Sequence, residues 1–152
     1  MKEKLLYENL NAAEVMSEKE IDSAFEFAKD YCTFLKCAKT ERESTRYILN
    51  LASERGFKPF NYSTRYNAGD KIFFNNRGKA CILAIIGSKT VDNGVRIVAS
   101  HIDCPRLDLK PRPLYQDGHM AFFKTHYYGG IKKYQWPTIQ LALHGTVIKS
   151  DG

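Results

Sequence analysis

Hydrophobic residues recur at helical spacing in the first part of the chain. From Ser17 onward they fall three or four residues apart, and Ser17 with Glu20 makes the capping-box pattern that marks a helix start. Thr40 with Glu43 repeats this pattern ahead of a second stretch of the same spacing, and Gly56 is placed to cap its end. The pattern predicts two successive helices that cover one face of a sheet.

After Gly69 the spacing becomes that of β-strands. Residues 71–74 and 80–86 are rich in apolar side chains, and an Asn-Asn-Arg-Gly sequence separates the two runs. Two such runs joined by a short group of turn-forming residues are typical of a β-hairpin. We therefore expect a hairpin here.

Three further stretches predict strands. Residues 95–101 follow a group of turn formers and make a β-rich run whose apolar flanks suit a central place in the sheet. A turn at Gly118 precedes an apolar run at 120–124, and residues 138–148 alternate between apolar and polar. The order of helix, helix, hairpin and strand predicts an α/β fold in which helices pack on a mixed sheet.

A proline-bearing segment from Lys110 to Pro113 is the one convincing linker in the sequence. We place a domain boundary there, with an α/β domain over residues 1–110 and the start of a β-rich domain over residues 111–152. A β segment with unpaired edges is expected to need a partner, because its free backbone groups can pair with another chain.

Composition narrows the class of protein. A chain of 152 residues with 43% hydrophobic content can form one modest core, or one domain and the start of another. No stretch approaches the roughly 18 apolar residues that span a bilayer, and the first residues are too polar for a signal peptide. The four cysteines form no Cys-x-x-Cys pair, which suits a reducing compartment. We expect a cytoplasmic protein with no membrane partner.

The formal charge of +6 raises the question of nucleic-acid binding. The 23 Lys and Arg residues are scattered along the chain, without a sustained basic helix or zinc-finger spacing. Lys132 and Lys133 lie among aromatic residues that could stack on bases, but solvated basic faces and buried aromatics are far commoner. We therefore expect no nucleic-acid partner.

The chemically most informative stretch is VASHIDCPRLDLKP, at residues 98–111. Residues two apart on an extended segment share a face, so His101 and Asp103 can both point into a cleft at the end of the 95–101 run. A neutral imidazole can bind Zn²⁺, and a nearby carboxylate can orient the ring through its other nitrogen. The alternative from this spacing alone is a polar pair in a surface turn, because His-x-Asp often occurs by chance.

The wider sequence resembles the M18 family of metallo-aminopeptidases, the aspartyl aminopeptidase and aminopeptidase I group. The segments that carry the resemblance appear in the family's order and are NRGKACILAIIG at 76–87, the 98–111 block and KTHYYGGIKKYQW at 124–136. The resemblance implies that His101 ligates one zinc of a two-zinc centre. It implies that Asp103 supports this ligand and shapes the catalytic centre.

The resemblance also sets expectations for the rest of the protein. It implies a zinc-dependent aminopeptidase that removes amino-terminal residues from peptides and assembles as a homo-oligomer. Residues 1–110 would be the first part of its catalytic domain, and residues 111–152 would begin an inserted dimerisation domain. Tyr128, Gly129 and Gly130 match a glycine motif at the entrance to that domain, and we interpret them as a turn rather than a catalytic element.

The sequence departs from a complete M18 site in two ways. Cys104 stands where family members commonly have serine, and we interpret it as a small buried cysteine rather than as a thiolate that competes for zinc. The family's other zinc ligands and its glutamate base lie beyond Tyr128. The remaining histidines show no spacing that rebuilds a site, so we expect the amino-terminal part of such an enzyme, inactive alone.

A second hypothesis belongs to another class of protein. The chain could be a non-catalytic binding or assembly module that retains the His-x-Asp segment from a peptidase ancestor. This hypothesis predicts a fold that is stable without metal, whereas a fold that depends on zinc loses stability when zinc is removed.

Overall fold

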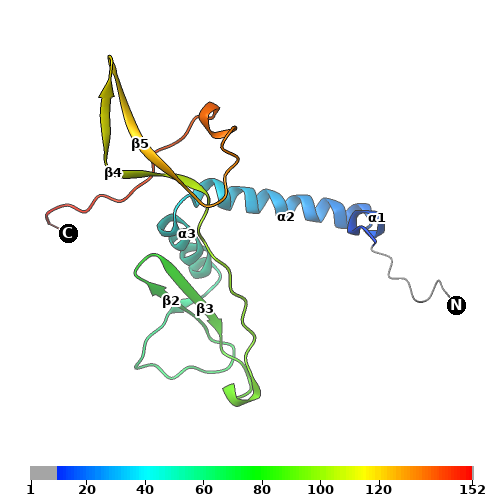
Figure 1. Cartoon of the computed structure of the whole chain (residues 1–152). Helices are drawn as coiled ribbons and strands as arrows, with labels where there is room; N and C mark the ends of the chain where they lie inside the picture. The colour runs from blue at the N-terminus through cyan, green and yellow to red at the C-terminus, as the bar shows by residue number, and fades with distance from the viewer. Residues whose placement is uncertain (1–9, 152) are drawn as a thin grey trace. The chain divides into compact units, whose positions relative to one another are not determined.

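The structure, a computed structural model, describes residues 10–151. It divides into two compact units, the first ending at Cys37 and the second beginning at Ala38. The first unit holds the short helix α1, Ala12–Val15, and the long helix α2, Glu18–Cys37 (Figure 1).

Helix α2 begins as the capping-box pattern predicts. The backbone N–H of Ser17 donates to the Glu20 carboxylate at 2.8 Å, and the N–H of Glu20 donates to the Ser17 hydroxyl at 3.4 Å. No residue of α2 is buried. The helix itself is confirmed, while its packing on a sheet stays a prediction.

Helix α3, Glu41–Glu54, opens the second unit with a complete capping box between Thr40 and Glu43. At the other end Arg55 is the C-cap and Gly56 follows with φ +82°. The N–H groups of Gly56 and Phe57 return to the carbonyls of Ser53 and Ala52, at 3.0 and 2.9 Å. This is a Schellman motif, in which a left-handed glycine lets the last carbonyls of a helix find donors.

The three-stranded sheet of the second unit is mixed, as predicted. Its strands are β1, Lys58–Pro59, β2, Lys71–Asn76, and β3, Ala80–Ile85, in the order β1-β2-β3. Strand β2 runs parallel to β1 and antiparallel to β3. Arg77 and Gly78 join β2 to β3 with φ values of +58° and +68°, which are typical of a type I′ hairpin turn.

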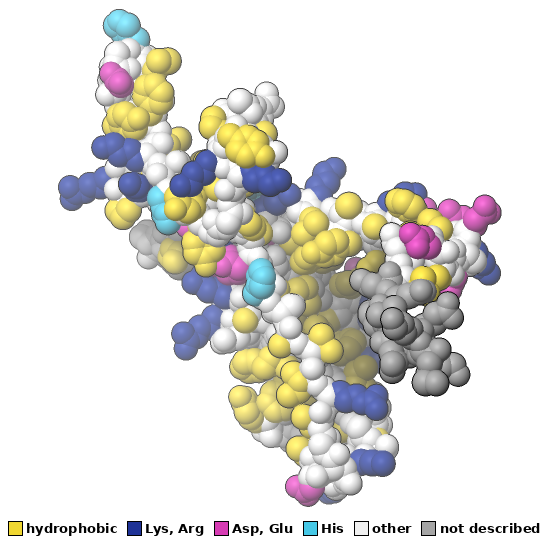
Figure 2. All heavy atoms as spheres, turned by 45° about the vertical axis from the view of Figure 1, so that its right-hand side comes forward, with side chains coloured by type: hydrophobic (Ala, Val, Ile, Leu, Met, Phe, Trp, Pro, Cys, Tyr) yellow, Lys and Arg dark blue, Asp and Glu magenta, His cyan; other side chains and the backbone are white. Residues whose placement is uncertain are grey.

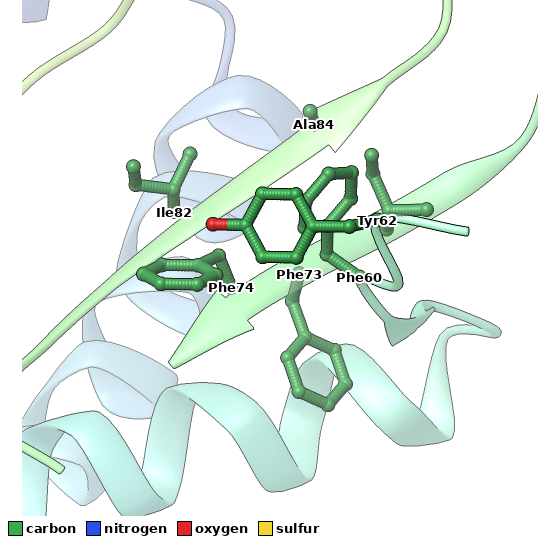
Figure 3. Close-up of a pocket in the computed structure, with 7 residues that line it drawn as sticks. Phe60, Tyr62, Phe73, Phe74, Ile82 and Ala84 are labelled. Atoms are coloured by element: carbon green, nitrogen blue, oxygen red, sulfur yellow. The ribbon is translucent and has the colours of Figure 1, made fainter. Parts of the chain in front are cut away.

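Helix α3 packs on β2 and β3 (Figure 1). Because strand side chains alternate between faces, Phe73 and Asn75 share the face on the α3 side, and Ile72 and Phe74 share the opposite face. Figure 3 shows that opposite face with its apolar cavity of about 330 Å³, over which gather Phe60, Tyr62, Phe74, Ile82 and Ala84. Phe73 points away from them, toward the helix.

The second sheet is a hairpin of two long strands, β4, Arg106–Asp117, and β5, Met120–Tyr128. Gly118, with φ +58°, lies in the predicted turn between them. The predicted linker at 110–113 is wrong, because this segment belongs to β4. Between Leu109 and Leu114 the register shifts and the strand bulges, since the prolines there have no N–H for the ladder. The division into domains 1–110 and 111–152 stays a prediction.

Two predicted strands are absent from the described residues. Segments 95–101 and 139–149 have no ladder partner anywhere in residues 10–151, and Val98 is fully exposed. A short 3₁₀ turn, Trp136–Thr138, occupies the start of the second of these predicted strands. Apolar alternation alone does not make a strand, because the backbone also needs a neighbour for its hydrogen bonds.

None of the helices in the described part of the chain is both long and apolar enough to cross a membrane.

Candidate metal-binding segment

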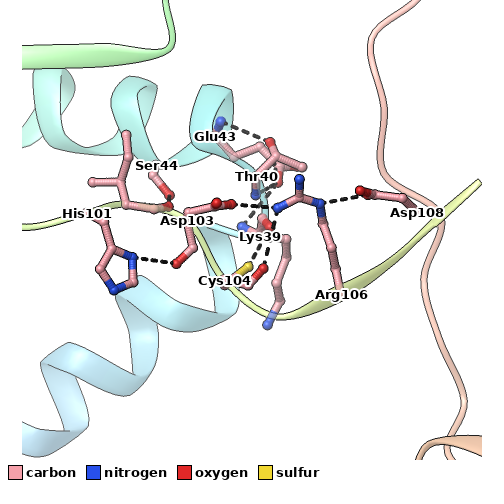
Figure 4. A network of polar contacts seen from close by, with 10 residues as sticks. Lys39, Thr40, Glu43, Ser44, His101, Asp103, Cys104, Arg106 and Asp108 are labelled. Atoms are coloured by element: carbon pink, nitrogen blue, oxygen red, sulfur yellow. Dashed lines mark hydrogen bonds and ion pairs between the residues drawn. The ribbon is translucent and has the colours of Figure 1, made fainter. Parts of the chain in front are cut away.

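His101 lies in the unpaired segment before β4, with its side chain exposed. Its Nδ1 atom is 3.0 Å from the backbone carbonyl oxygen of Asp103 (Figure 4). A carbonyl can only accept, so this hydrogen bond requires the proton on Nδ1. The lone pair of a neutral ring is then on Nε2, which is the arrangement that a metal-binding histidine needs.

The Asp103 carboxylate does not face this ring. Figure 4 shows it turned toward Arg106, and the Arg106 Nη1 donates to its Oδ1 at 2.6 Å. The predicted contact from the Asp103 carboxylate to the imidazole is therefore corrected. The orienting group is the backbone carbonyl of the same residue, because the carboxylate pairs with the Arg106 cation instead.

Arg106 connects four parts of the site. Its Nε donates to Asp108 at 2.7 Å, and its Nη1 contacts both the Asp103 carboxylate and the Cys104 carbonyl, the latter at 3.4 Å. The guanidinium also lies over the Tyr128 ring, 4.0 Å from the ring centre. All three charged side chains are about two-thirds buried, with exposed fractions of 31% for Arg106, 37% for Asp103 and 36% for Asp108.

These contacts shift the protonation equilibria of the group. A hydrogen bond from the Tyr128 hydroxyl, followed by one from Arg106, lowers the pKa of Asp103. The same carboxylate raises the pKa of Tyr128, and Asp108 followed by Asp103 raises the pKa of Arg106. Asp103 is thus held as a carboxylate and Tyr128 as a neutral hydroxyl at neutral pH.

Two contacts attach the segment to the start of helix α3. The Cys104 thiol donates to the Lys39 carbonyl at 2.9 Å, and the hydroxyl of the buried Ser44 lies 3.5 Å from the Ile102 carbonyl. Cys104 is half-buried rather than fully buried, and its sulfur serves as a hydrogen-bond donor. The residue therefore has a structural contact, which agrees with our preference for a packing role.

Gly129 brings the end of β5 against the same segment. It has φ +75°, and a Cβ placed on it would lie 3.3 Å from the Cα of Pro105. Both the backbone conformation and the close approach disfavour a larger side chain at this position. Gly129 thus shows the positive φ and the close backbone approach expected of this glycine motif, but Tyr128 belongs to β5 rather than to a turn.

Sequence reasoning missed the role of Arg106 and Tyr128. The alternating charges of Asp103, Arg106 and Asp108 can be seen in the sequence. The contact of Arg106 with the Tyr128 ring cannot be seen there. Tyr128 reaches the guanidinium because it pairs with Arg106 in the β4–β5 ladder, and that register depends on the bulge in β4.

The described residues bring together no full set of metal ligands, and the metal role of His101 stays a prediction. No group of three or more His, Cys, Asp or Glu side chains in residues 10–151 is arranged to hold a metal ion. Among the other histidines, His144 is engaged by the Glu43 carboxylate at 2.9 Å. A structural or catalytic zinc needs at least three protein ligands, so the described residues by themselves do not make a zinc centre.

Basic side chains do not gather around this segment. Figure 2 shows Lys and Arg side chains spread over the visible face rather than forming one patch. Lys133 lies over the Tyr127 ring, 4.3 Å from its centre, and this ring is 50% exposed. The absence of a nucleic-acid partner stays a prediction.

Comparison with known proteins identifies the family. Residues 34–152, most of the chain, match the family described as Aminopeptidase I zinc metalloprotease (M18). The chain belongs to the M18 family. The α/β fold class and the resemblance inferred from the sequence are thereby confirmed.

Individual M18 proteins are similar over almost the whole chain. A probable M18 family aminopeptidase 1 of Clostridium acetobutylicum is 41% identical, over 97% of this chain and 33% of its own length. One of Thermotoga maritima is 44% identical, over 83% and 28%. The crystal structure of aminopeptidase I from Borrelia burgdorferi B31 matches with a TM-score of 0.77 and 41% identity, over 84% of this chain and 31% of that one. The chain spans about a third of the length of these relatives.

Gly129 and Gly130 offer a matched test of the close approach to Pro105. Gly129→Ala should lower the free energy of unfolding by about 1–3 kcal/mol, because it combines a positive φ with a backbone clash. Gly130→Ala meets nothing within 4 Å and should change it by no more than about 1 kcal/mol. Urea unfolding measures both. Equal losses for the two variants would contradict the account of this turn.

The contact between Glu43 and His144 predicts a dependence on pH. The hydrogen bond from His144 is the largest cause that lowers the pKa of Glu43. A carboxyl with a lowered pKa stabilises the fold above its ordinary pKa, about 4.3, and this stabilisation is lost as the pH falls through the lowered value. An NMR titration of the Glu43 carboxyl should show this low pKa in the wild type.

The variant His144→Ala should raise the pKa of Glu43 toward its ordinary value. His119→Ala is the control, because His119 lies in the turn between β4 and β5 and has no contact with Glu43. An unchanged Glu43 pKa in His144→Ala would show that segment 139–149 does not lie against α3 in solution.

Proposed function

We propose that the protein carrying this chain is a zinc-dependent aminopeptidase that removes amino-terminal residues from peptides. In this proposal His101 is a ligand of one of two zinc ions, and Asp103 is a supporting residue of the catalytic centre. Membership of a zinc metalloprotease family supports the reaction class. The chain alone, with one candidate ligand in its described residues, is proposed to be inactive.

The geometry of His101 is the single observation that carries the proposal. The Asp103 carbonyl accepts a hydrogen bond from the Nδ1–H, and the ring is otherwise exposed, so Nε2 is left with a lone pair and room for a metal. A zinc-binding histidine commonly donates its second nitrogen in this way, which fixes the tautomer and the direction of the ring. The donor thus fits zinc, although its partner ligands are not among residues 10–151.

Asp103 supports the site through its backbone and its side chain. The backbone carbonyl orients His101, while the carboxylate is held in its charged form by Tyr128 and Arg106. Asp103, Asp108 and the Arg106 between them carry one net negative charge, which favours a cation in the adjacent space. When bound, zinc supplies an activated water for attack on the scissile carbonyl.

The remaining parts of the proposal concern the whole protein. We propose a peptide substrate, a homo-oligomeric assembly and a cytoplasmic location. We also propose that residues 1–110 begin the catalytic domain and that residues 111–152 begin an inserted dimerisation domain. The exposed apolar side chains of β4 and β5, among them Leu114 and Phe123 at 65% and 54%, support an interface role for this hairpin.

The alternative is that the 152-residue chain acts as a non-catalytic binding or assembly module. One observation favours it for the chain by itself, namely the lack of a three-ligand group in the described residues. The two hypotheses differ in what happens when the full-length protein is tested, since the module hypothesis predicts no zinc-dependent hydrolysis at all.

The first test is His101→Ala in the full-length protein. Zinc content, measured by atomic absorption, should fall by about one ion per subunit, and hydrolysis of a short peptide should be lost, because the ligand is removed. His119→Ala should retain both. A His101→Ala protein that is fully metallated and active would overturn the assignment.

The second test is Asp103→Asn, which keeps the side-chain volume but removes the charge. Turnover should fall about 10- to 100-fold, because changes around a metal ligand typically cost that much activity. Thermal melting should remain close to that of the wild type, since the backbone carbonyl that holds His101 is retained. Wild-type turnover in Asp103→Asn would remove the side chain from the site.

A further inference from the structure

A second cavity of about 330 Å³ lies between helix α3 and the turn that joins β2 to β3. Side chains from successive turns of one helix face line it, because residues three and four apart are neighbours on a helix surface. The helix contributes Arg42, Thr45, Arg46, Leu49 and Asn50, the end of β2 and its turn contribute Asn75 and Gly78, and segment 139–149 contributes Thr146. The proposed peptidase activity makes no use of this cavity.

The cavity is positively charged and has no internal counter-charge. None of the described residues that line it is acidic, and neither Arg42 nor Arg46 forms an ion pair within the described part of the chain. Arg42 donates at 3.4 Å to the carbonyl of Arg77, which holds its guanidinium beside the turn. Two like charges four residues apart on a helix repel each other, and an anion between them would remove that cost.

Thr45 adds an unusual feature to the cavity wall. Its side chain is 1% exposed, and its hydroxyl has no hydrogen-bond partner among the described residues. A buried hydroxyl without a partner destabilises the fold, so such groups are rare in native structures. Thr45 lines the cavity, and a ligand oxygen that reached the hydroxyl, whose own oxygen has less than 1 Å² exposed, would give it an acceptor.

The side-chain amide of Asn75 has N–H groups available for a ligand. Its Oδ1 accepts the backbone N–H of Gly78 at 2.8 Å, and this leaves the two N–H groups of its amide for another partner. Donors therefore come from two directions, the helix and the turn. A tetrahedral oxyanion can accept from several directions at once, whereas the two oxygens of a carboxylate lie in one plane.

We propose that this cavity binds a phosphate group, either as free phosphate or as a small phosphate monoester. The guanidinium groups of Arg42 and Arg46 would contact its oxygens, and the Thr45 hydroxyl and Asn75 amide would complete the set of donors. The volume exceeds what inorganic phosphate needs, and Leu49 in the wall provides apolar surface for the organic part of an ester.

Isothermal titration calorimetry of the protein tests this proposal, with inorganic phosphate as the probe and ionic strength held constant with sodium chloride. Phosphate should bind at one saturable site. Phenyl phosphate in a second titration separates the two sources, because tighter binding than that of phosphate indicates an ester. Absence of saturable binding by both, or equal binding of acetate, would overturn the proposal.

Variants distinguish the site from general charge attraction. Arg46→Gln, at an exposed position, should weaken phosphate binding at least about tenfold, because a charged hydrogen bond is lost. Arg65→Gln makes the same charge change at an exposed position outside the cavity and should leave binding within about twofold. Equal weakening in these two variants would mean non-specific attraction and would overturn the proposal.

Thr45→Val separates a ligand contact from a structural role. Valine keeps the shape of threonine, so without phosphate the melting temperature should stay the same or rise as the unpaired hydroxyl is removed. Phosphate binding should nevertheless weaken several-fold. Unchanged binding in a folded Thr45→Val protein would exclude Thr45 from the site, and if this variant does not fold, Arg46→Gln decides the proposal.

Discussion

The position of the candidate zinc ligand depends on one guanidinium group. Arg106 forms ion pairs with Asp103 and Asp108 and donates a hydrogen bond to the Cys104 carbonyl. Its guanidinium also packs on the face of the Tyr128 ring. Without it, two carboxylates and a tyrosine would meet at the start of a hairpin with no cation between them, and like charges at such distances repel. Because Arg106 pairs with Tyr128 in the β4–β5 ladder, these contacts connect the hairpin to the segment that carries His101. The site is therefore a local property of the first residues of β4 rather than of a long strand.

Helix α3 is the second support of the segment that carries His101. Glu43 forms the capping box at the start of the helix, and the same carboxylate also accepts a hydrogen bond from His144. The carbonyl just before the helix accepts the Cys104 thiol, and Ser44 reaches the Ile102 carbonyl. The helix start thus holds two segments that are far from it in sequence. Its other end and its sheet-facing side chains hold the β2–β3 hairpin, so one short helix joins the sheet to the candidate metal-binding segment.

Local signals explain what the sequence predicted well. Both capping boxes, the glycine after α3 and the β2–β3 turn depend on residues at most a few positions apart, and each is present in the structure. The strands expected at 95–101 and 138–148 were wrong because a strand needs a ladder partner, which periodicity does not reveal. The linker predicted at Lys110 to Pro113 was wrong because a bulge lets prolines remain within a strand, and the sequence does not reveal the bulge. The His101 segment was found from its motif, but the contacts of Arg106 follow from a register that no local pattern encodes.

The central claim is that this stretch contributes a single zinc ligand to a centre that needs further residues. Native mass spectrometry of the purified 152-residue chain in a volatile buffer containing zinc tests it directly, because mass and bound metal are read from the same ion. The account predicts a 17.4 kDa polypeptide that retains no stoichiometric zinc. A chain of that mass that carries two tightly bound zinc ions would contradict it.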